Sequence, residues 1–540
     1  MIKQQIPPII KEILLARGFE SETDMVKFLF SGIPSLTDPF SIPVLKNACD
    51  TLKKTILNGE KVFVFGDGDV DGICGVFLIL SFFRDLGIKI PFYLTHRLED
   101  NYEIPTSLIS ELKENGFSTL ITVDCGISSV EALKKAEQLG LKCIILDHHI
   151  MEFPDKLPKS HIYVNPNCIK WNKDFSYLSG TGVVFKFITG MEQLMSGLRE
   201  KRISKMYEIP CLAALADIVP LVGENRIFVK EGLRKLPFTS IKGLNYLLDF
   251  YRLKPTPTIR DIVMRLNPKL NSPGRLGKPE IVLELLLEND ISLIEKIANE
   301  IDANDRERYR AITKIMKTIE NCDDIEKGFI ISDDDYRGLS GIIASRLAGK
   351  FERPFVVCYK KDDFIRGSIR TPDGYLLHSL KSNIEEFMDE IGGHSQAVGF
   401  KCSSTKIDIV KDIWDSTEWH FHINKQYDCE LDIDKLTPSL IEDIFTYLEP
   451  FGKGNPLPIF LCRNITIKTI RADEPNTKKC WVKNKNSFFE ATLPEKINIP
   501  QPDELSDIYY TPYVRSFNGL YRIILKISNL TTYSSGSVDC

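Results

Sequence analysis

The sequence predicts an α/β protein in which two α/β domains are joined by a long helix and followed by a small β-barrel. Three observations support this fold class. Strand-like and helix-like runs alternate from residue 46 to about 225, a second alternation starts near residue 328, and short strand-like runs follow one another after about residue 456. Alternating strands and helices are typical of a parallel sheet covered by helices, whereas consecutive short strands are typical of a barrel.

The composition is that of an ordinary globular protein. Its 540 residues are 43% hydrophobic and 26% charged, and this length predicts three or four domains. The net charge of −5 gives no global sign of nucleic-acid binding, although the carboxylates of a metal site subtract from any local basic groove. The 13 cysteines include no C-x-x-C pair, so we expect buried thiols in a reducing compartment. The chain start has no signal-peptide core, and no apolar run approaches the about 20 residues of a membrane span, so we expect a soluble cytoplasmic protein.

The first part of the chain is expected to form a cap and then a parallel sheet. Residues 1–45 are expected to be helical and then extended. The strand-like runs that follow are 62–65, 88–94, 119–123, 143–146 and 162–164. Functional sites of such sheets gather at the C-terminal ends of the strands.

The first strand-like run leads directly into a cluster of carboxylates. Asp67, Asp69 and Asp71 follow it at alternating positions within residues 61–72. Like charges this close repel unless a cation is present, and hard oxygen ligands favour Mg²⁺, Mn²⁺ or Ca²⁺. An EF-hand loop is excluded because its twelfth position would be Leu78 and the preceding segment is strand-like. A solvated acidic turn remains the alternative at this point.

Two further strand ends carry polar side chains, and a sixth carboxylate lies in an apolar segment. Asp124 ends the run 119–123, while Asp147, His148 and His149 follow the run 143–146. Past a strand end, both imidazoles can turn toward one cavity. Asp217 lies within an apolar segment, where a carboxylate is rare unless it is paired or bound to a metal. A lone histidine is more often structural, but this pair shares its sheet edge with several carboxylates, which favours a metal site.

Residues 226–320 are expected to be mainly helical. Isoleucines at helical spacing predict a long helix from Ile294 to near Asn321. Asp305 and Arg308 interrupt its apolar seam, which we interpret as a solvated or inter-domain crossing and not as a site.

The second α/β domain and the barrel complete the chain. Strands are expected at 328–332, 354–359 and 364–369, with a helix at 340–347. Residues 392–394, Gly-Gly-His, are interpreted either as a tight turn or as backbone that meets an anion. Beyond a turn-rich segment at 450–456, the strand-like runs 461–470, 478–492, 507–514 and 520–528 predict the barrel.

These segments together resemble the DHH phosphoesterase superfamily and, within it, the RecJ-type single-strand-specific exonucleases. Residues 66–72 are similar to motif I, 122–128 to motif II, 146–149 to the name-giving motif and 216–221 to motif IV. Segments 178–182 and 265–275 also have counterparts in RecJ-type chains. Segments 338–346, 366–370 and 392–400 resemble the DHHA1 domain, and 448–456 resembles the segment leading into the RecJ OB-fold.

A few positions depart from the RecJ-type pattern. Asp335-Tyr336 stands where a Trp-His pair is common, Asn101-Tyr102-Glu103 where Gly-Tyr-Gly is usual, and Ser395-Gln396 where small and apolar residues are usual. These departures bear on rate and strand handling and leave the expected metal ligands intact.

The resemblance implies a domain order for the whole chain. It comprises an N-terminal cap (1–45), a DHH catalytic domain with a parallel sheet (46–225), a helical connector with the long inter-domain helix (226–325), a DHHA1 domain (326–402), a helical linker (403–455) and an OB-like domain (456–540).

The resemblance also implies a metal-dependent 5′→3′ exodeoxyribonuclease, acting on single-stranded DNA in repair and recombination. Two divalent ions roughly 4 Å apart, Mn²⁺ preferred and Mg²⁺ possible, would support phosphodiester hydrolysis that releases nucleotides. Carried over by motif, the catalytic residues are Asp69, Asp71, Asp124, His148, His149 and Asp217, and the metal ligands are Asp67, Asp69, Asp71, Asp124, His148 and Asp217. Asp69 and Asp71 are expected on different ions with Asp124 between them. His149 is expected at the scissile phosphate, and Asp147 is expected to orient a ligand.

The substrate residues implied by the resemblance lie mostly in the second half of the chain. They are Arg97, Arg275, Ser368, Arg370, Gly393 and His394. Arginine forks suit a terminal phosphate. The aromatic residues Tyr509, Tyr510, Tyr513, Phe517 and Tyr521 are available in the barrel to stack bases, with core packing as the favoured alternative for most of them. The expected partners are a 5′-ended single strand, a single-strand-binding protein and a helicase, and the expected state is a monomer.

Two other functions stay open from the sequence. A DHH-family phosphodiesterase acting on short oligonucleotides or small nucleotides would use the same metals without needing residues 450–540. A catalytically silent replication scaffold would be expected to have lost metal ligands, whereas this chain keeps them.

Overall fold

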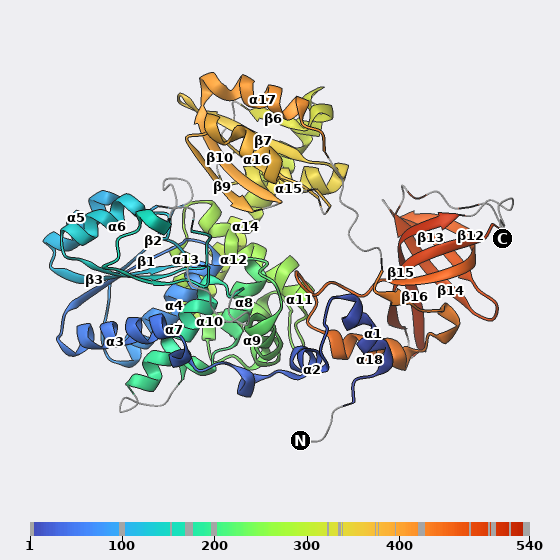
Figure 1. Ribbon diagram of the computed structural model, residues 1–540, viewed down its shortest axis with the longest axis horizontal. Coiled ribbons are helices and arrows are strands. Elements are labelled where there is room, and N and C mark those ends of the chain that lie inside the picture. The colour runs from blue at the N-terminus through green and yellow to red at the C-terminus, as the bar shows by residue number, and fades with distance from the viewer. Residues whose placement is uncertain are drawn as a thin grey trace. The chain divides into compact units, whose positions relative to one another are not determined.

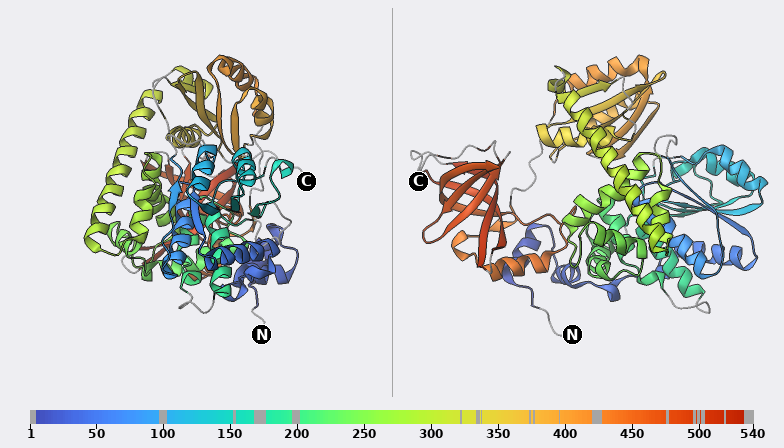
Figure 2. Two further views of the ribbon diagram at one scale, coloured as in Figure 1. Left: turned by 90° about the vertical axis from the view of Figure 1, so that its left-hand side faces the viewer. Right: turned by 180° about the vertical axis from the view of Figure 1, so that it is seen from behind.

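The structure divides into two compact units (Figures 1 and 2). The computed structural model describes residues 5–96, 103–151, 154–167, 177–195, 202–320, 323–332, 336, 338–372, 374–375, 377–394, 396–419, 427–474, 477–494, 497, 500, 504–517 and 520–532. The unit of residues 36–219 and 223–422 is here called the α/β unit, and that of 1–35, 220–222 and 423–540 the barrel unit. Among the helices in these ranges, none has the length and apolar character needed to cross a membrane.

The first sheet of the α/β unit is parallel throughout, as predicted. Its strands lie in the order β2-β1-β3-β4-β5, with bounds β1 Lys61–Gly66, β2 Phe92–Leu94, β3 Phe117–Val123, β4 Lys142–Leu146 and β5 Ile162–Val164. The predicted run 88–94 forms a strand only from Phe92, directly after Pro91, which has no N–H for a ladder.

Helices cover both faces of this sheet (Figure 1). Phe63 and Phe65 point to the face that packs against α5 and α6, whereas Val62 and Val64 point to the other face, where α3 and α4 lie. The bounds are α3 Pro43–Leu57, α4 Val70–Asp85, α5 Thr106–Glu114 and α6 Val130–Gln138. Burial on both faces explains why β1 is a continuous apolar run.

A helical region follows the sheet. Its helices are α7 Gly180–Leu194, α8 Glu208–Ala216, α9 Gly223–Lys235, α10 Lys242–Phe250, α11 Ile259–Asp261, α12 Asn267–Arg275, α13 Glu280–Leu287 and α14 Ile291–Glu320, with a π-helical turn at Ile262–Leu266 between α11 and α12. The 30-residue helix α14 confirms the predicted long helix and is the longest helix in Figure 2. It contacts α10, α12 and α13, and its Ile312 and Ile319 pack with helix α15 (Ser340–Phe351) and strand β7 (Phe355–Lys361) of the second sheet.

The interruption of the α14 seam is an internal ion network and not a solvated crossing. The Asp305 carboxylate accepts hydrogen bonds from Ser272 (3.1 Å) and Lys269 (2.9 Å) of α12 and from Arg308 (2.6 Å). Helices α12 and α14 are therefore joined through the Asp305 carboxylate.

The second sheet of the α/β unit has the order β6-β7-β8-β10-β9, in which only the β6–β7 pairing is parallel. The bounds are β6 Phe329–Ser332, α15 Ser340–Phe351, β7 Phe355–Lys361, β8 Phe364–Arg370, α16 His378–Ile384, β9 Glu390–His394, β10 Ala397–Ser403 and α17 Ile407–Ser416. Residues 392–394 therefore belong to strand β9, and the expected turn begins beyond them. Strands β9 and β10 were not predicted from the sequence.

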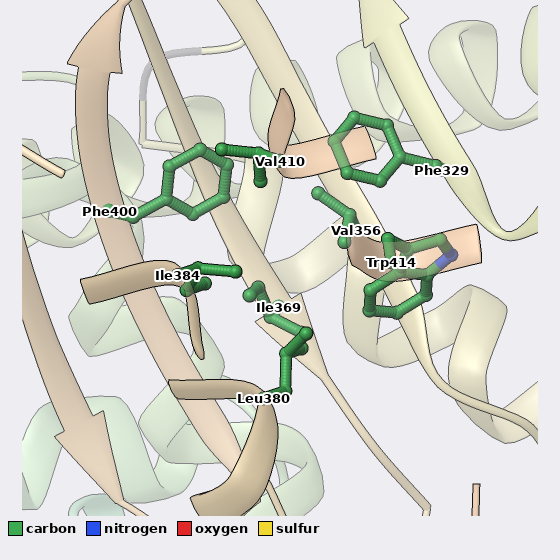
Figure 3. Close-up of a pocket in the computed structure, with 8 residues that line it drawn as sticks. All are labelled: Phe329, Val356, Ile369, Leu380, Ile384, Phe400, Val410 and Trp414. Atoms are coloured by element: carbon green, nitrogen blue, oxygen red, sulfur yellow. The ribbon is translucent and has the colours of Figure 1, made fainter. Parts of the chain in front are cut away.

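A small apolar pocket lies in the core of this second domain (Figure 3). Side chains from β6, β7, β8, β10, α16 and α17 line it: Phe329, Val356, Ile369, Leu380, Ile384, Phe400, Val410 and Trp414. Trp414 Nε1 donates a hydrogen bond to the Lys327 carbonyl (2.9 Å), so the indole N–H is satisfied. The pocket is part of the hydrophobic core of this domain.

The barrel unit confirms the predicted C-terminal barrel. Its strands lie in the order β11-β12-β13-β14-β16-β15, and pairing of β12 with β15 closes the sheet on itself. The bounds are β11 Cys429–Glu430, α18 Pro438–Leu448, β12 Phe460–Glu474, β13 Thr477–Lys483, β14 Phe488–Pro494, β15 Ser506–Phe517 and β16 Leu520–Thr532. The predicted run 478–492 is two strands because polar residues 484–487 turn between them, with the Asn484 N–H bonded to the Ser487 carbonyl (3.1 Å).

The N-terminal residues do not form one cap. Helices α1 (Pro8–Ala16) and α2 (Glu22–Phe30) belong to the barrel unit, where Ile10 and Ile13 are buried in a core shared with α18 and the barrel strands. Arg17 fixes this contact through Asp428 (2.9 Å) and Asn455 (2.6 Å). Residues 36–45 belong to the α/β unit, so the predicted cap of 1–45 is divided between the units. The other predicted domain boundaries stay predictions.

A buried ion pair ties the start of the α/β unit to its helices. Lys186 and Glu224 are 4% and 2% exposed, their charged atoms are 2.9 Å apart, and both contact the Thr37 backbone. We expect Lys186→Met to destabilise the protein by about 3–5 kcal/mol, because it leaves a buried carboxylate without its partner. Urea unfolding measures this, and adding Glu224→Gln should recover part of the loss. If the substitution Lys134→Met in an exposed ion pair lowered the stability equally, burial of the Lys186–Glu224 pair would not be the cause of the loss.

Candidate active site

Polar side chains from neighbouring strands meet at the C-terminal edge of the first sheet. Strand β1 leads into Asp67 and Asp69, β3 into Asp124, and β4 into His148 and His149. Because β1, β3 and β4 are adjacent and parallel, their C-terminal ends lie at the same edge. Helix α8 ends at Asp217, which joins the same cluster.

The side chains at this edge form three overlapping groups in which ligand atoms lie within 4.8 Å of one another. They are Asp67, Asp69 and Asp124; Asp71, His148 and Asp217; and Asp124, His148 and His149. Asp124 and His148 each belong to two groups. The cluster can therefore hold more than one cation, with Asp124 between the first group and the imidazoles.

The His148 ring nitrogen Nε2 lies close to carboxylate oxygens of both groups to which His148 belongs. It lies 3.2 Å from Asp124 Oδ1, 3.5 Å from Asp217 Oδ2 and 3.9 Å from Asp71 Oδ2. His148 Nε2 and Asp124 Oδ1 are buried and make no hydrogen bond to any residue that the structure describes. Buried polar atoms are rarely left in this state, and a coordinated cation would satisfy both.

The electrostatics of the cluster agree with a cation site. Burial and neighbouring carboxylates raise the pKa of Asp124 well above its usual value, and burial also raises the pKa of Asp71. Burial raises the pKa of Asp217 to about 6, although His148 opposes the change. Crowded carboxylates favour protonation when no positive ion is near, and a bound cation restores their charged form. The carboxylate oxygens and imidazole nitrogens of the cluster are therefore suitable ligands for divalent cations.

Asp71 is held by the N-terminus of helix α7. Its two carboxylate oxygens accept hydrogen bonds from the Gly180 N–H (2.8 Å) and the Thr181 N–H (2.7 Å). These N–H groups carry the positive end of the helix dipole, which stabilises a carboxylate. Gly180 also lies against Asp124, because a Cβ atom at this position would come within 2.3 Å of Asp124 Oδ1. One helix end thus fixes two carboxylates of the cluster.

The other two aspartates of the first strand end have different local roles. Asp69 caps helix α4, and its Oδ1 accepts from the Asp71 N–H (3.0 Å) and the Gly72 N–H (3.1 Å). Asp67 Oδ1 accepts from the Thr95 hydroxyl (2.5 Å) and from the adjacent Gly68 N–H (2.8 Å). Both side chains are therefore fixed in place and still share a group with Asp124.

Asp147 organises the histidine pair. It is fully buried, and its Oδ1 accepts a hydrogen bond from His149 Nδ1 (2.8 Å). Partial burial lowers the pKa of His149, but the Asp147 carboxylate overcomes this effect and raises that pKa to about 10. The His149 side chain is half exposed beside the cluster.

Comparisons with known proteins agree with this geometry. The family model of the DHH family, N-terminal domain, matches residues 61–217, and that of the RecJ OB domain matches residues 427–529. Two separate regions of the chain are thus similar to domains found in RecJ-type proteins of the DHH family. The chain is 28% identical over 501 residues to the single-stranded-DNA-specific exonuclease RecJ of Bacillus subtilis, covering 90% of this chain and 62% of that protein.

The chain is also similar to RecJ proteins from other sources. The RecJ of Thermus thermophilus is 28% identical over 423 residues, covering 77% of this chain and 61% of that protein, so the chain spans about three fifths of the length of these two relatives. The crystal structure of Thermus thermophilus RecJ with Mn²⁺ matches with a TM-score of 0.79 at 22% identity, over 98% of this chain and 79% of that chain. This match establishes the fold. A structure of exonuclease RecJ bound to manganese has 25% identity and a TM-score of 0.58, over 69% of this chain and 94% of that chain.

All the metal ligands expected from the DHH motifs come together in one cluster, as do the expected catalytic residues: Asp67, Asp69, Asp71, Asp124, His148, His149 and Asp217. Asp147 bonds to the ring of His149 and not to that of His148. Arg97, expected at the substrate, lies outside the described residues.

A second group of expected residues gathers around the start of helix α15. Arg275 donates a hydrogen bond to the Gly338 carbonyl (3.0 Å). On strand β8, the Ser368 hydroxyl lies 3.5 Å from that of Ser340, and a Cβ atom at Gly341 would come within 2.8 Å of the Arg370 guanidinium. Two arginines and two serines thus surround one helix N-terminus, which is a suitable environment for a phosphate.

The remaining substrate predictions fall on strand β9. Gly393 has a positive φ of 132°, and a Cβ atom there would come within 2.1 Å of the Ala397 carbonyl oxygen, so the hairpin itself requires glycine. His394 pairs with Ala397 at the end of the strand. Of the departures from the family pattern, Asn101, Tyr102, Asp335 and Ser395 lie outside the described residues.

Sequence reasoning missed the residues that hold the carboxylates. Thr95 follows β2 and binds Asp67, Gly180 and Thr181 bind Asp71, and the Asn271 side chain accepts the Val70 N–H (3.2 Å) at the start of α4. Thr95 had a usable signal, because a hydroxyl directly after a strand lies at the same sheet edge. Gly180, Thr181 and Asn271 lie in the segments 178–182 and 265–275 that resemble RecJ-type chains, but the sequence does not indicate their contacts with residues about 110 and about 200 positions away.

Proposed function

We propose that this protein is a single-stranded-DNA-specific 5′→3′ exonuclease that hydrolyses phosphodiester bonds and releases nucleotides. The observation that carries the proposal is the position of Asp124, which is shared by an all-carboxylate group and a group containing both imidazoles. Such an arrangement suits two divalent ions with one bridging carboxylate. The named activity of the RecJ relatives supports the choice of substrate.

In this proposal, Asp67, Asp69, Asp71, Asp124, His148 and Asp217 hold two divalent ions. When bound, the ions supply an activated water and neutralise the charge that develops on phosphoryl oxygens. The chain keeps the ligands fixed through the α7 N-terminus and Thr95. Half-exposed His149, oriented by Asp147, is assigned to the scissile phosphate. Imidazole ligands favour Mn²⁺ over Mg²⁺, and RecJ structures with each ion are known.

We assign the 5′ end of the substrate to the group around helix α15. Arg275 and Arg370 are anchored by backbone carbonyls, and Ser340 and Ser368 add hydroxyl donors. A guanidinium binds phosphate oxygens in a fork, and the first peptide N–H groups of a helix add further donors. Gly393 and His394 are retained in the proposed site on the family resemblance.

The stacking surface of the barrel differs in part from the expected one, because Tyr510 is buried whereas Tyr521 is exposed. Tyr510 is fully buried and its hydroxyl donates to the Leu431 carbonyl (2.8 Å), so it is a core residue and not a stacking residue. Trp481 and Phe488 instead lie on the outside of β13 and β14, with their ring centroids 4.5 Å apart and their planes 3° from parallel. Phe488 is 52% exposed and Tyr521 69%.

Basic residues flank this aromatic pair. Lys468 lies opposite Trp481, and Lys483 opposite Phe488, while Glu490 is the carboxylate across from Trp481. Exposed aromatic rings between lysines are the arrangement that binds single-stranded nucleic acid by stacking and backbone charge. We therefore assign this face of the barrel to the single strand.

Replacing Trp481 and Phe488 together by Ala should raise the KM for a long single strand by about tenfold or more, because stacking is worth about 1–3 kcal/mol per base. The hydrolysis rate for a dinucleotide should not change. Steady-state kinetics with the two substrates measure this. Phe238→Ala, which removes an 83% exposed aromatic ring of the α/β unit, should leave both substrates unaffected. If the double variant has the wild-type KM for the long strand, this face of the barrel does not bind the single strand.

The activity itself is tested with purified protein, Mn²⁺ and 5′-phosphorylated DNA labelled at its 3′ end. We expect stepwise shortening of the single strand from its 5′ end, no digestion of blunt duplex, and no activity with EDTA. Failure to degrade the single strand would disprove the exonuclease. Turnover of short oligonucleotides alone would favour the alternative, a DHH-family phosphodiesterase for short oligonucleotides or small nucleotides.

The cellular setting is part of the same proposal. We propose a cytoplasmic monomer that acts in DNA repair and recombination with a single-strand-binding protein and a helicase. Size-exclusion chromatography with light scattering tests the monomer, and co-purification with each partner tests the associations.

A further inference from the structure

The histidine pair lies beyond the end of its strand, where the sheet no longer satisfies its backbone. Strand β4 ends at Leu146, and Asp147 makes a last ladder contact through its N–H to the Val164 carbonyl (3.3 Å). The N–H and carbonyl groups of His148 and His149 need other partners, because buried or half-buried backbone groups are rarely left unpaired.

Two asparagines after the neighbouring strand β5 bind the carbonyl groups of the histidine pair. The Asn165 side chain is fully buried, and its Nδ2 donates to the His149 carbonyl (2.9 Å). Its Oδ1 accepts the Asn167 N–H (2.8 Å), which closes a tight turn. Asn167 Nδ2 in turn donates to the His148 carbonyl.

Asp147 satisfies the N–H groups of the same two residues. Its Oδ1 accepts from the His148 N–H (2.7 Å) and the His149 N–H (3.1 Å), and its Oδ2 accepts from the Ile127 N–H (3.1 Å). All four backbone polar groups of the histidine pair are thus bonded to side chains. Ile127 belongs to the segment that follows Asp124, so Asp147 also links the two strand ends.

We propose that Asn165 and Asn167 are positioning residues that hold the backbone of His148 and His149, so that the His148 imidazole already lies at the proposed metal site before any ion binds. This inference rests on the proposed function for the identity of the ligands. A ligand whose backbone is already fixed loses little freedom when it binds, so less of the binding free energy is spent on ordering it. Supporting groups of this kind typically change metal affinity or activity by about 10–100-fold when they are removed.

The two asparagines can be tested separately because they differ in burial. Asn167 is exposed, so Asn167→Ala removes the bond to His148 without disturbing the core. Asn165→Asp keeps an acceptor for the Asn167 N–H but places a carboxylate oxygen against the His149 carbonyl, which breaks that one bond. Asn115→Ala, which removes an exposed side-chain bond at the end of α5, is the matched control.

The primary measurement is Mn²⁺ affinity of the full-length protein, by titration followed with electron paramagnetic resonance. We expect Asn167→Ala and Asn165→Asp to bind Mn²⁺ about 10–100-fold more weakly than wild type, and Asn115→Ala to bind equally well. Activity of Asn167→Ala should recover at saturating Mn²⁺, with the KM for DNA unchanged. If the two asparagines only stabilised the fold, their substitution would lower the free energy of unfolding, and activity would not recover at saturating Mn²⁺.

Unchanged Mn²⁺ affinity in a folded Asn167→Ala protein would overturn the inference, whether or not Asn165→Asp folds. Activity that stays low at saturating Mn²⁺ would overturn it as well. A wild-type protein that binds Mn²⁺ tightly but degrades no DNA would disprove the proposed exonuclease, and the role of the asparagines would still be decided by the affinities.

Discussion

Asp124→Asn should reduce the Mn²⁺-dependent hydrolysis rate by about 1000-fold or more. Asp124 belongs to two of the three ligand groups, so its loss affects both proposed ions, and metal stabilisation of developing phosphoryl charge is worth several kcal/mol. Asparagine is a suitable replacement because it is nearly isosteric and tolerates the positive φ of 58° at this position. Single-turnover kinetics at saturating single-stranded DNA measure the effect.

The same substitution, Asp124→Asn, should increase the stability of the metal-free protein. Asp124 is buried, its pKa is raised by burial and by neighbouring carboxylates, and its Oδ1 has no hydrogen-bond partner among the described residues. Replacing the carboxylate by a neutral amide removes like-charge repulsion, so the thermal midpoint with EDTA should rise and its increase on adding Mn²⁺ should shrink. Full activity, or an unchanged response to Mn²⁺, would contradict the shared role of Asp124.

The position of the site could be predicted because it follows from topology. In a parallel sheet, every strand delivers its C-terminal residue to one edge, so Asp67, Asp124 and His148 had to lie near one another once the strands were recognised. Asp217 was found by another physical signal, the cost of a carboxylate in an apolar segment. The family resemblance then supplied the roles.

The residues that complete the site could not be predicted in the same way. The contacts of Asp71 with Gly180 and Thr181 join segments about 110 residues apart, and nothing local in either segment indicates the other. The division of the N-terminal residues has the same origin. Helix α1 is amphipathic, and the sequence cannot say which unit will cover its apolar side. Tertiary packing, and not local propensity, decides such contacts.

Burial also separates residues that look alike in sequence. Tyr509 and Tyr510 are neighbours in a strand, yet one is partly exposed and the other lies in the barrel core. A strand alternates its faces, so the register against β12 decides which ring is available, and that register depends on the whole closed sheet. The pair Trp481 and Phe488 is not predicted from the sequence, because the single predicted run 478–492 hides the pairing of β13 with β14.

Gly180→Ala should abolish most of the hydrolysis although it changes only one methyl group. The added Cβ would come within 2.3 Å of Asp124 Oδ1 and 2.7 Å of Asp124 Cβ, so the whole side chain must move, not its tip alone. Gly180 starts helix α7 without a positive φ, so the backbone accepts alanine, and alanine is favoured over glycine within helices by up to about 1 kcal/mol. We therefore expect a folded protein with an at least about 100-fold lower kcat, since displacement of about 1 Å can cost this much.

The control for this prediction is Gly349→Ala in helix α15, where a Cβ atom would meet nothing within 4 Å. It should keep wild-type kcat and Mn²⁺ affinity, whereas Gly180→Ala should lose both while retaining its circular dichroism spectrum. The comparison separates the general effect of alanine in a helix from the specific contact with Asp124. If Gly180→Ala binds Mn²⁺ as tightly as wild type, then Asp124 does not bind the ions in the position that the structure gives it.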